Sequence, residues 1–422
     1  MAENSIKGVI SATLAEDEVK FTDTQRSEPR PKVVRKTLKN SERASDFFSR
    51  MGERTKLTFD LQTVGGADGS KPYSGSKFER IILASVQTDL RLETFQRGSK
   101  KPAEHHFDSE VGMLLAKDEQ REAIWNNRAR ALAKSIDKGA HIISFCEFGL
   151  PPVDIDISEI PQEVRGDPFH RDFVDCVDTQ YQIAATKLLE AAKQQSRICK
   201  SNKFEMPFVF YGSAHCVASR YNLGVVSPGH PIEDSYSVTT NRRSPIGEFV
   251  QSKEIEKNAG SGPIAHKKRF PAHRMGERAR VPDNQNFRTY QHPLGQICVL
   301  ISSDSLDLNQ FFNIVKINNE VGLERLDRIF LVVVPSFNRS EDMMQCCEDL
   351  SALAGTNVLV TNAIGELAGP RRKTMPRSEL FFDGMPSNQL VDEELVITSE
   401  SDSIRLYDID VIAQSDWLRR ER

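Results

Sequence analysis

The amino-acid sequence predicts an α/β fold, because from Phe78 onward short runs rich in β-branched and aromatic residues alternate with segments of helical periodicity. The chain has 422 residues, which is long enough for one large domain of this class together with an extension. Residues 1–76 differ in composition, with few large apolar residues, many charges and several Gly and Ser residues before the first strong strand. We therefore expect a charged, partly flexible N-terminal extension over residues 1–76 and an α/β domain over residues 77–422.

The extension contains a basic segment. Residues 24–56 carry ten Lys or Arg residues against four Asp or Glu residues. Within it, Ala44, Phe47, Phe48 and Met51 fall on one face of a short helix, which would dock on the main domain or on a protein partner. A flexible, solvated arm is the other interpretation, and the sequence leaves both open.

Strands and helices are expected to alternate along the domain. Runs of β-branched and aromatic residues predict strands over residues 80–87, 141–147, 208–213, 296–302, 329–335 and 357–361. Helical spacing predicts helices over residues 119–137, 181–192 and 340–354. In the first helix Trp125, Ala129, Leu132 and Ile136 form one apolar stripe, and Gly139 is placed to end it.

Charge and cysteine usage narrow the classes of function. The chain has 56 Lys and Arg residues against 60 Asp and Glu residues, so its net charge of −4 gives no global reason to expect nucleic acid or an anionic membrane as partner. No run approaches the ~18 apolar residues that span a bilayer, and the N-terminus lacks the layout of a secretory signal, so a cytoplasmic protein is expected. The seven cysteines show no paired C-x-x-C spacing, and we expect neither a metal site nor a cofactor.

Three segments carry polar residues at the ends of apolar or basic runs, in a fixed order. The first is the apolar run 140–146, which ends at Glu147; a carboxylate there loses hydration unless it is paired or used. The second is the basic run 266–277, which closes at Glu277. The third is the apolar run 295–301, which is followed by Ser-Ser-Asp. Each signal is weak by itself.

Together these segments resemble the nitrilase, or carbon-nitrogen hydrolase, superfamily, whose catalytic set is a glutamate, a lysine and a cysteine at the ends of strands. Glu147 matches the family's glutamate, and Lys268 matches its lysine best, with Lys267 open by one register step. Glu277 matches the second glutamate, which in the family holds the lysine and the nucleophile region in place. Ser302 stands where the family has its cysteine, and the resemblance covers roughly residues 78–410.

The resemblance implies a nitrilase-like αββα sandwich that forms a homodimer through its helical face. It also implies that Ser302 attacks an amide or nitrile carbon with Glu147 as general base, while Lys268 and a backbone N–H near Ser303 stabilise the oxyanion. The substrate-binding residues expected on the same ground are Ser303, Asp304 and Asn362.

The serine departs from the family pattern. A hydroxyl is far less acidic than a thiol and normally needs a histidine as base. His266 and His273 flank the lysine and are candidates for that base, although we expect histidines in a basic loop to be solvated. Neither nearby cysteine replaces the nucleophile, because Cys298 lies four residues up the strand in the expected core and Cys146 points to the face opposite Glu147.

Two functions from different classes are compatible with the resemblance. One is hydrolysis of a non-peptide amide or nitrile C–N bond, with a small amide-like molecule as partner. The other is a catalytically inactive sensor or scaffold subunit, such as one that serves a reverse-transcriptase-associated bacterial defence system. A third reading is nucleic-acid binding, which lacks interleaved aromatic residues and is not expected; the basic residues concerned are Lys267, Lys268, Arg269, Arg274, Arg278, Arg280, Arg371, Arg372, Lys373 and Arg377.

Overall fold

A computed structural model of the chain describes residues 80–410, apart from residues 89, 91–102, 111, 201–205, 230–234, 241–253, 259–261, 274–275, 283–286, 293–294, 321–328, 338–340, 364–377, 383, 387–394 and 399–401. The predicted extension over residues 1–76, with its basic segment 24–56, lies outside the described residues.

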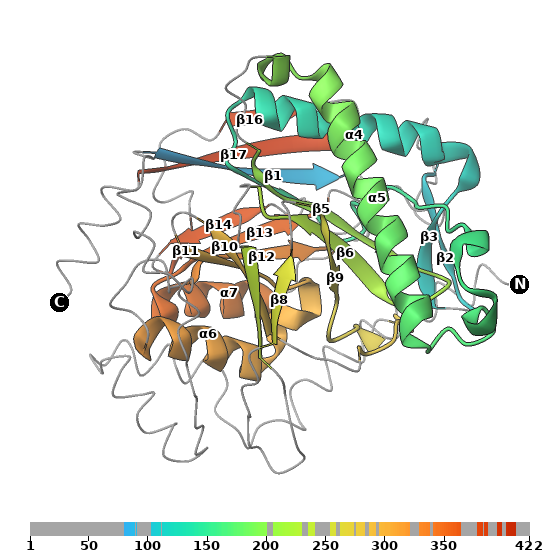
Figure 1. Cartoon of the computed structure of the whole chain (residues 1–422). Coiled ribbons are helices and arrows are strands. Elements are labelled where there is room, and N and C mark those ends of the chain that lie inside the picture. Colours follow the sequence, from blue (N-terminus) through green and yellow to red (C-terminus); the bar gives the residue numbers. More distant parts are fainter. Residues whose placement is uncertain are drawn as a thin grey trace, which may run out of the picture.

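Four layers make up the described part of the chain: a pair of helices, two sheets packed face to face, and a second pair of helices (Figure 1). One apolar cluster lies between the first helices and the first sheet, a second lies between the two sheets, and a third lies between the second sheet and the other helices. The α/β class and the αββα sandwich predicted from the sequence are confirmed by this arrangement.

The first sheet has the strand order β16-β17-β1-β4-β5-β6-β9. Its strands, in chain order, are β1 (Arg80–Thr88), β4 (Ile142–Phe145), β5 (Phe208–His215), β6 (Asn222–Ser227), β9 (Ile264–Lys267), β16 (Leu395–Thr398) and β17 (Asp402–Asp410). Strands β1, β4 and β5 run parallel, so their carboxyl ends lie at one edge. β17 pairs antiparallel with β1 along its whole length, which joins the two ends of the domain.

The second sheet has the strand order β15-β14-β13-β12-β11-β10-β7-β8. Its strands are β7 (Ser235–Thr240), β8 (Glu254–Asn258), β10 (Phe287–His292), β11 (Gly295–Val299), β12 (Ile329–Ser336), β13 (Asn357–Asn362), β14 (Glu379–Phe382) and β15 (Met385–Pro386). β11, β12 and β13 run parallel at its centre. A separate hairpin is formed by β2 (His105–Asp108) and β3 (Met113–Ala116).

The helices cover the outer faces of the sheets. α4 (Arg121–Asp137) and α5 (Arg171–Gln195) pack on the first sheet, and α6 (Leu308–Glu320) and α7 (Glu341–Ala354) pack on the second. α5 begins ten residues before its predicted start, because Phe173, Val174 and Val177 continue the buried stripe and His170 caps the first turn. The sequence analysis assigned no element to α6, although its buried side chains at Phe311, Ile314 and Val315 have helical spacing.

Two expectations about the candidate site segments were wrong at the level of secondary structure. Ser302 does not belong to the preceding strand, which ends at Val299, but begins a 3₁₀ helix over Ser302–Leu306. The basic run is not all loop, because its first residues form β9, which pairs with β6. Both differences arise from the packing of the strand ends, which the local pattern does not encode.

Candidate active site

Glu147 lies just beyond the end of β4, and its side chain is buried. Phe148, the next residue, has a φ of 60°, a left-handed conformation that non-glycine residues rarely adopt. The Phe148 N–H donates a hydrogen bond to Ser213 Oγ at 3.2 Å, which ties this turn to β5. The strand is thus stopped abruptly, and Glu147 is held in a fixed place at the edge of the first sheet.

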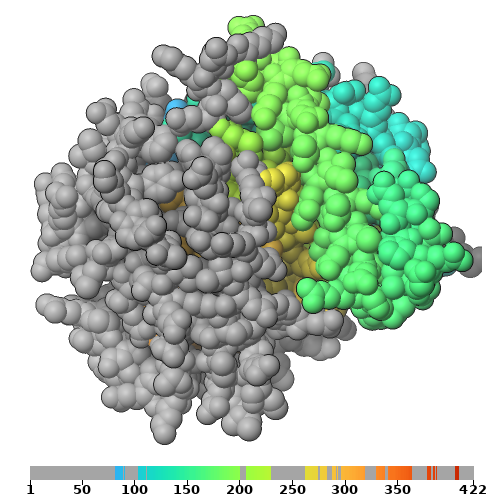
Figure 2. All heavy atoms as spheres, in the orientation of Figure 1, coloured from blue at the N-terminus to red at the C-terminus, as the bar shows by residue number. Residues whose placement is uncertain are grey.

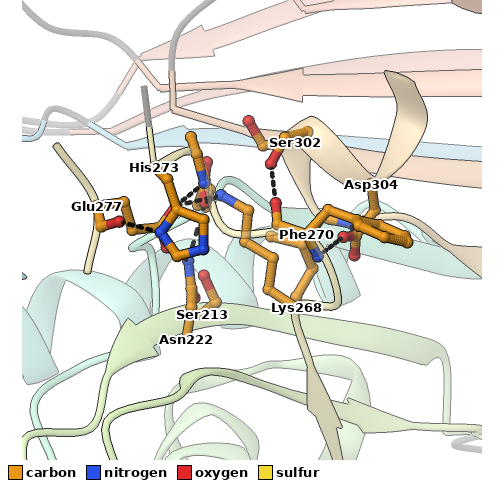
Figure 3. A network of polar contacts seen from close by, with 12 residues as sticks. Ser213, Asn222, Lys268, Phe270, His273, Glu277, Ser302 and Asp304 are labelled. Atoms are coloured by element: carbon orange, nitrogen blue, oxygen red, sulfur yellow. Dashed lines mark hydrogen bonds and ion pairs between the residues drawn. The ribbon is translucent and has the colours of Figure 1, made fainter. Parts of the chain in front are cut away.

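Lys268 directly follows β9 and is 1% exposed. Its backbone N–H donates to the Asn222 carbonyl at 2.9 Å, which extends the pairing with β6 by one residue. Its Nζ donates to Glu147 Oε1 at 2.7 Å and to Glu277 Oε2 at 2.8 Å, and Figure 3 shows this network. An ammonium group has three hydrogens, so one N–H of Lys268 has no acceptor in the part of the chain that the structure describes.

The charges of Lys268 and Glu277 stabilise each other. Burial alone would lower the pKa of Lys268, but Glu147 and Glu277 outweigh burial and raise this pKa above its ordinary value. Burial alone would raise the pKa of Glu277, but Lys268 and His215 outweigh it and hold this pKa well below its ordinary value. Both groups are therefore ionised at neutral pH.

The two glutamates differ in how many of their carboxylate oxygens accept hydrogen bonds from the described residues. Glu277 Oε1 accepts from Asn222 Nδ2 at 3.0 Å and from His215 Nε2 at 3.1 Å. Glu277 Oε2 accepts from Lys268 and from the Ala272 N–H at 2.7 Å, so both of its oxygens are occupied. Glu147 Oε1 accepts from Lys268 and from Asn222 Nδ2 at 2.9 Å, whereas its Oε2 accepts nothing from the described part of the chain. Of the two, only Glu147 has an oxygen open to a new proton.

Two further members of this network, Asn222 and His215, were not among the predicted site residues. They face each other as a residue pair between β5 and β6, and both are buried. His215 Nδ1 accepts from the Leu114 N–H at 2.7 Å, so in the neutral ring Nε2 carries the hydrogen that is given to Glu277. A usable signal was the presence of a polar side chain on each side of the turn between the two strands.

Ser302 begins the 3₁₀ helix with a φ of 48°, again in the left-handed region. Its side chain is partly exposed, and its hydroxyl makes no hydrogen bond within the described residues. The turn is fastened to the segment after Lys268, because Asp304 Oδ1 accepts from the Arg269 N–H at 3.0 Å and the Phe270 N–H at 2.8 Å. Ser303 Oγ also donates to the Phe270 carbonyl. In Figure 3 Asp304 and Glu277 lie on opposite sides of Lys268.

The three residues expected to bind substrate differ in whether their polar side-chain atoms already have hydrogen-bond partners. Asp304 is 0% exposed and its carboxylate faces backbone N–H groups, which leaves it no open oxygen for a substrate. The Ser303 hydroxyl is occupied by the Phe270 carbonyl. Asn362 ends β13, and both polar atoms of its buried side chain lack a partner among the described residues. Substrate binding by Asn362 stays a prediction.

The choice between the two adjacent lysines is decided by the strand alternation of β9. Lys268 points to the two glutamates, whereas Lys267 Nζ pairs with Asp178 of α5 at 2.8 Å. In Figure 2 the yellow segment that contains β9 lies directly beside the green helix α5 on the face shown. Lys267 therefore fastens the strand to the helix layer and is excluded from the site.

The other candidate nucleophiles and bases lie elsewhere. His266 was expected to be solvated, but it is buried between the sheets with Nδ1 2.7 Å from the Tyr290 hydroxyl, and burial lowers its pKa well below the ordinary value. His273 is exposed, as expected, and its Nδ1 lies 2.9 Å from the Glu277 carbonyl. Cys298 lies in the core, as expected, and burial raises its pKa to about 12. A thiol in that state is not a nucleophile.

The described basic residues considered for nucleic-acid binding do not all lie on the surface. Lys268 and Arg269 are buried, and Lys267 is paired with Asp178. Arg274 and the basic residues of 371–377 lie outside the described residues. Within the described ranges, no group of three or more His, Cys, Asp or Glu residues is placed to hold a metal ion. None of the helices described is long and apolar enough to cross a membrane.

No protein-family model and no curated protein sequence matches this chain. Among solved structures, it is similar to Nit3 from Saccharomyces cerevisiae, a member of branch 10 of the nitrilase superfamily, with 10% identity and a TM-score of 0.42 over 81% of this chain and 94% of that one. It is also similar to a variant of an amidase of the nitrilase superfamily from Nesterenkonia AN1, with 12% identity and a TM-score of 0.38 over 81% of this chain and 96% of that one. A further similarity, at 9% identity and a TM-score of 0.41, covers 79% of this chain and 46% of the glutamine-dependent NAD+ synthetase of Acinetobacter baumannii.

Proposed function

We propose that the chain is a nitrilase-superfamily protein that hydrolyses a non-peptide amide or nitrile C–N bond. Glu147 is the general base, Ser302 the nucleophile, Lys268 the oxyanion-stabilising group, and Glu277 the residue that holds the lysine. The observation that carries this proposal is one N–H of Lys268 that has no acceptor among the described residues. The other two hydrogens of this ammonium group are donated to Glu147 and Glu277.

The buried charge itself supports a functional role. Removing a lysine and two carboxylates from water costs several kcal/mol per ion, and a packed apolar cluster would often be at least as stable. Lys268 is 1%, Glu147 2% and Glu277 7% exposed, so this desolvation is nearly complete. A site that must stabilise developing negative charge in a dry environment gives a reason to retain such a cluster.

Hydrolysis of an amide would proceed through an ester on Ser302. Ser302 Oγ bonds to the carbonyl carbon, its proton passes to Glu147 Oε2, and the carbonyl oxygen becomes an oxyanion that accepts the third N–H of Lys268. The C–N bond then breaks, Glu147 returns the proton to the leaving nitrogen, and an ester on Ser302 remains. Water attacks the ester, again with Glu147 taking and returning one proton, and releases the carboxylic acid and the free hydroxyl.

A second candidate function is an inactive sensor or scaffold, as in a reverse-transcriptase-associated bacterial defence system. One observation favours it: the Ser302 hydroxyl makes no hydrogen bond to a base within the described residues. The same Lys268 would then bind a small amide-like or anionic ligand without turnover. A protein partner would dock through residues 24–56 in either case.

The test compares the native chain with Ser302→Cys and Glu147→Gln on a panel of small amides and nitriles, by release of ammonia or amine. We expect the native chain to turn over a member of the panel, and Glu147→Gln to lower kcat by about 10²- to 10⁴-fold, because a general base is lost. The matched control is Glu159→Gln, a change of the same kind at an exposed residue, which leaves kcat unchanged.

The other outcomes point to the second candidate. Turnover by Ser302→Cys alone means that the site is intact and that the native chain has lost its nucleophile. If no form releases ammonia or amine from any member of the panel and all forms are folded, hydrolysis is contradicted. Ligand binding is then left as the role of Lys268.

A further inference from the structure

Asp304 is a buried carboxylate beside the site that the proposed chemistry does not use. It is 0% exposed and lies in the 3₁₀ helix that begins at Ser302. Its Oδ1 accepts the N–H groups of Arg269 and Phe270, at 3.0 and 2.8 Å, and its Oδ2 accepts the Ile301 N–H at 3.2 Å. One carboxylate therefore joins two chain segments that are more than thirty residues apart.

The two joined segments are those of the proposed nucleophile and the proposed oxyanion group. The Arg269 nitrogen belongs to the peptide bond that follows Lys268, and the Ile301 nitrogen lies one residue before Ser302. The Asp304 carboxylate and the bond from Ser303 to the Phe270 carbonyl fasten these two segments to each other.

The groups around Asp304 favour its ionised form, whereas its burial disfavours that form. Arg269 Nε lies 4.0 Å from Asp304 Oδ2, and Arg269 Nη1 donates to Gln310 Oε1 at 3.1 Å. Burial raises the pKa of Asp304 to about 6, although Arg269, Lys268 and the backbone N–H groups of Phe270 and Ile301 lower it. The neighbouring Cys298 thiol is neutral, because burial raises its own pKa.

We propose that Asp304 is a positioning residue that holds Ser302 opposite Lys268 and does not contact substrate. This inference rests on the proposed function for its importance, but its geometry can be tested without turnover. Because burial raises the pKa of Asp304 above that of a solvated carboxyl, proton uptake near pH 6 favours the closed arrangement of the two segments over an opened one.

The test uses a thiol at position 302 as a probe of position. In Ser302→Cys, a thiol held near the Lys268 ammonium has a lowered pKa and reacts with iodoacetamide at neutral pH. In Asp304→Asn the amide nitrogen confronts the Ile301 N–H, so the thiol at position 302 moves away from the Lys268 ammonium. We therefore expect alkylation at pH 7 to slow by about tenfold in this background and the pKa of the thiol, read from the pH profile of the rate, to rise. Peptide mass spectrometry separates position 302 from the seven native cysteines.

The matched control is Asp307→Asn in the same background, since the Asp307 carboxylate accepts hydrogen bonds only from Asn309 of its own segment. Equal alkylation rates and pH profiles for folded Asp304→Asn, Asp307→Asn and their parent would overturn the inference. Should Asp304→Asn fail to fold, hydrogen exchange on the native chain decides: the protection factors of the Arg269, Phe270 and Ile301 amides rise together as the pH falls from 7.5 to 5, because the closed segments bind the Asp304 proton more tightly than opened ones, and unchanged protection factors contradict the inference. Failure of the proposed function is separate, because a native chain without turnover can still show both effects.

Discussion

Two of the three described non-glycine residues with positive φ belong to the candidate site: Ser302 itself and Phe148, which follows Glu147; the third is Arg220, two residues before Asn222. Such conformations cost of order 1–3 kcal/mol each and persist only where the surrounding structure fixes them. Here the fixing contacts are the bond from Phe148 to Ser213 and those of the Asp304 carboxylate. Strain and hydrogen bonding therefore converge on the same few residues.

Glu277→Gln tests how Lys268 is held. Replacing a buried ionised partner leaves the ammonium with one carboxylate, and we expect the free energy of unfolding at pH 7 to fall by about 3–5 kcal/mol, measured by urea denaturation. The pKa of Glu277 is lowered in the folded chain, so its stabilisation is present above its unfolded pKa of 4.5 and is lost as the pH falls below it. The difference between native and variant should therefore shrink at pH 3 to 4. A constant difference across this range would contradict the ionised pairing.

At the scale of elements, the site depends on where strands stop. The pairing of β5 with β6 shifts register between Phe210 and Ser213, and this irregularity turns Ser213 toward the Phe148 N–H. Gly212 lies within it with a φ of 95°, and a Cβ there would lie 2.5 Å from the Leu150 nitrogen. A side chain at this position meets backbone that cannot move without displacing the turn after Glu147.

Gly212→Ala is therefore expected to destabilise the chain by about 1–3 kcal/mol, through strain at positive φ and the close contact. Activity on any substrate should fall with it, because Glu147 shifts. Thermal unfolding measures the first effect. Gly166→Ala is the control, since a Cβ at Gly166 meets nothing within 4 Å and should change Tm little. Similar unfolding of both variants would contradict a structural role for Gly212.

At the scale of the whole molecule, two helical layers enclose two sheets, and α5 exposes an apolar side chain at mid-helix, Ile183, which is 45% exposed. The resemblance noted in the sequence predicts a homodimer through a helical face. We expect the chain to sediment as a dimer at micromolar concentration and Ile183→Asp to shift it toward monomer, because a charge on that face would be desolvated. Val217→Asp, at an exposed residue outside the helices, is the control. Monomeric sedimentation of the native chain contradicts the prediction.

The predicted bounds of several helices and strands lie near the observed ones, because the sequence signals for these elements are local. β-branched runs and helical stripes placed β1, β12, β13, α4 and α7 within a few residues of their observed bounds. Their exact ends were less predictable: the strand before Ser302 stops at Val299, and Lys267 ends β9, because pairing with neighbouring strands decides both.

By itself, the sequence determined the α/β class and which charged and hydroxyl side chains follow its apolar runs, because periodicity and composition act over a few residues. The tertiary structure alone decided that Lys268 and not Lys267 meets Glu147 across 121 residues and that Asn222 and His215 join them. It also decided that the Asp304 carboxylate accepts backbone N–H groups of two segments. These facts depend on which strand ends are packed together and on which polar groups burial leaves without water. Contacts of that kind are fixed only when the two sheets come together.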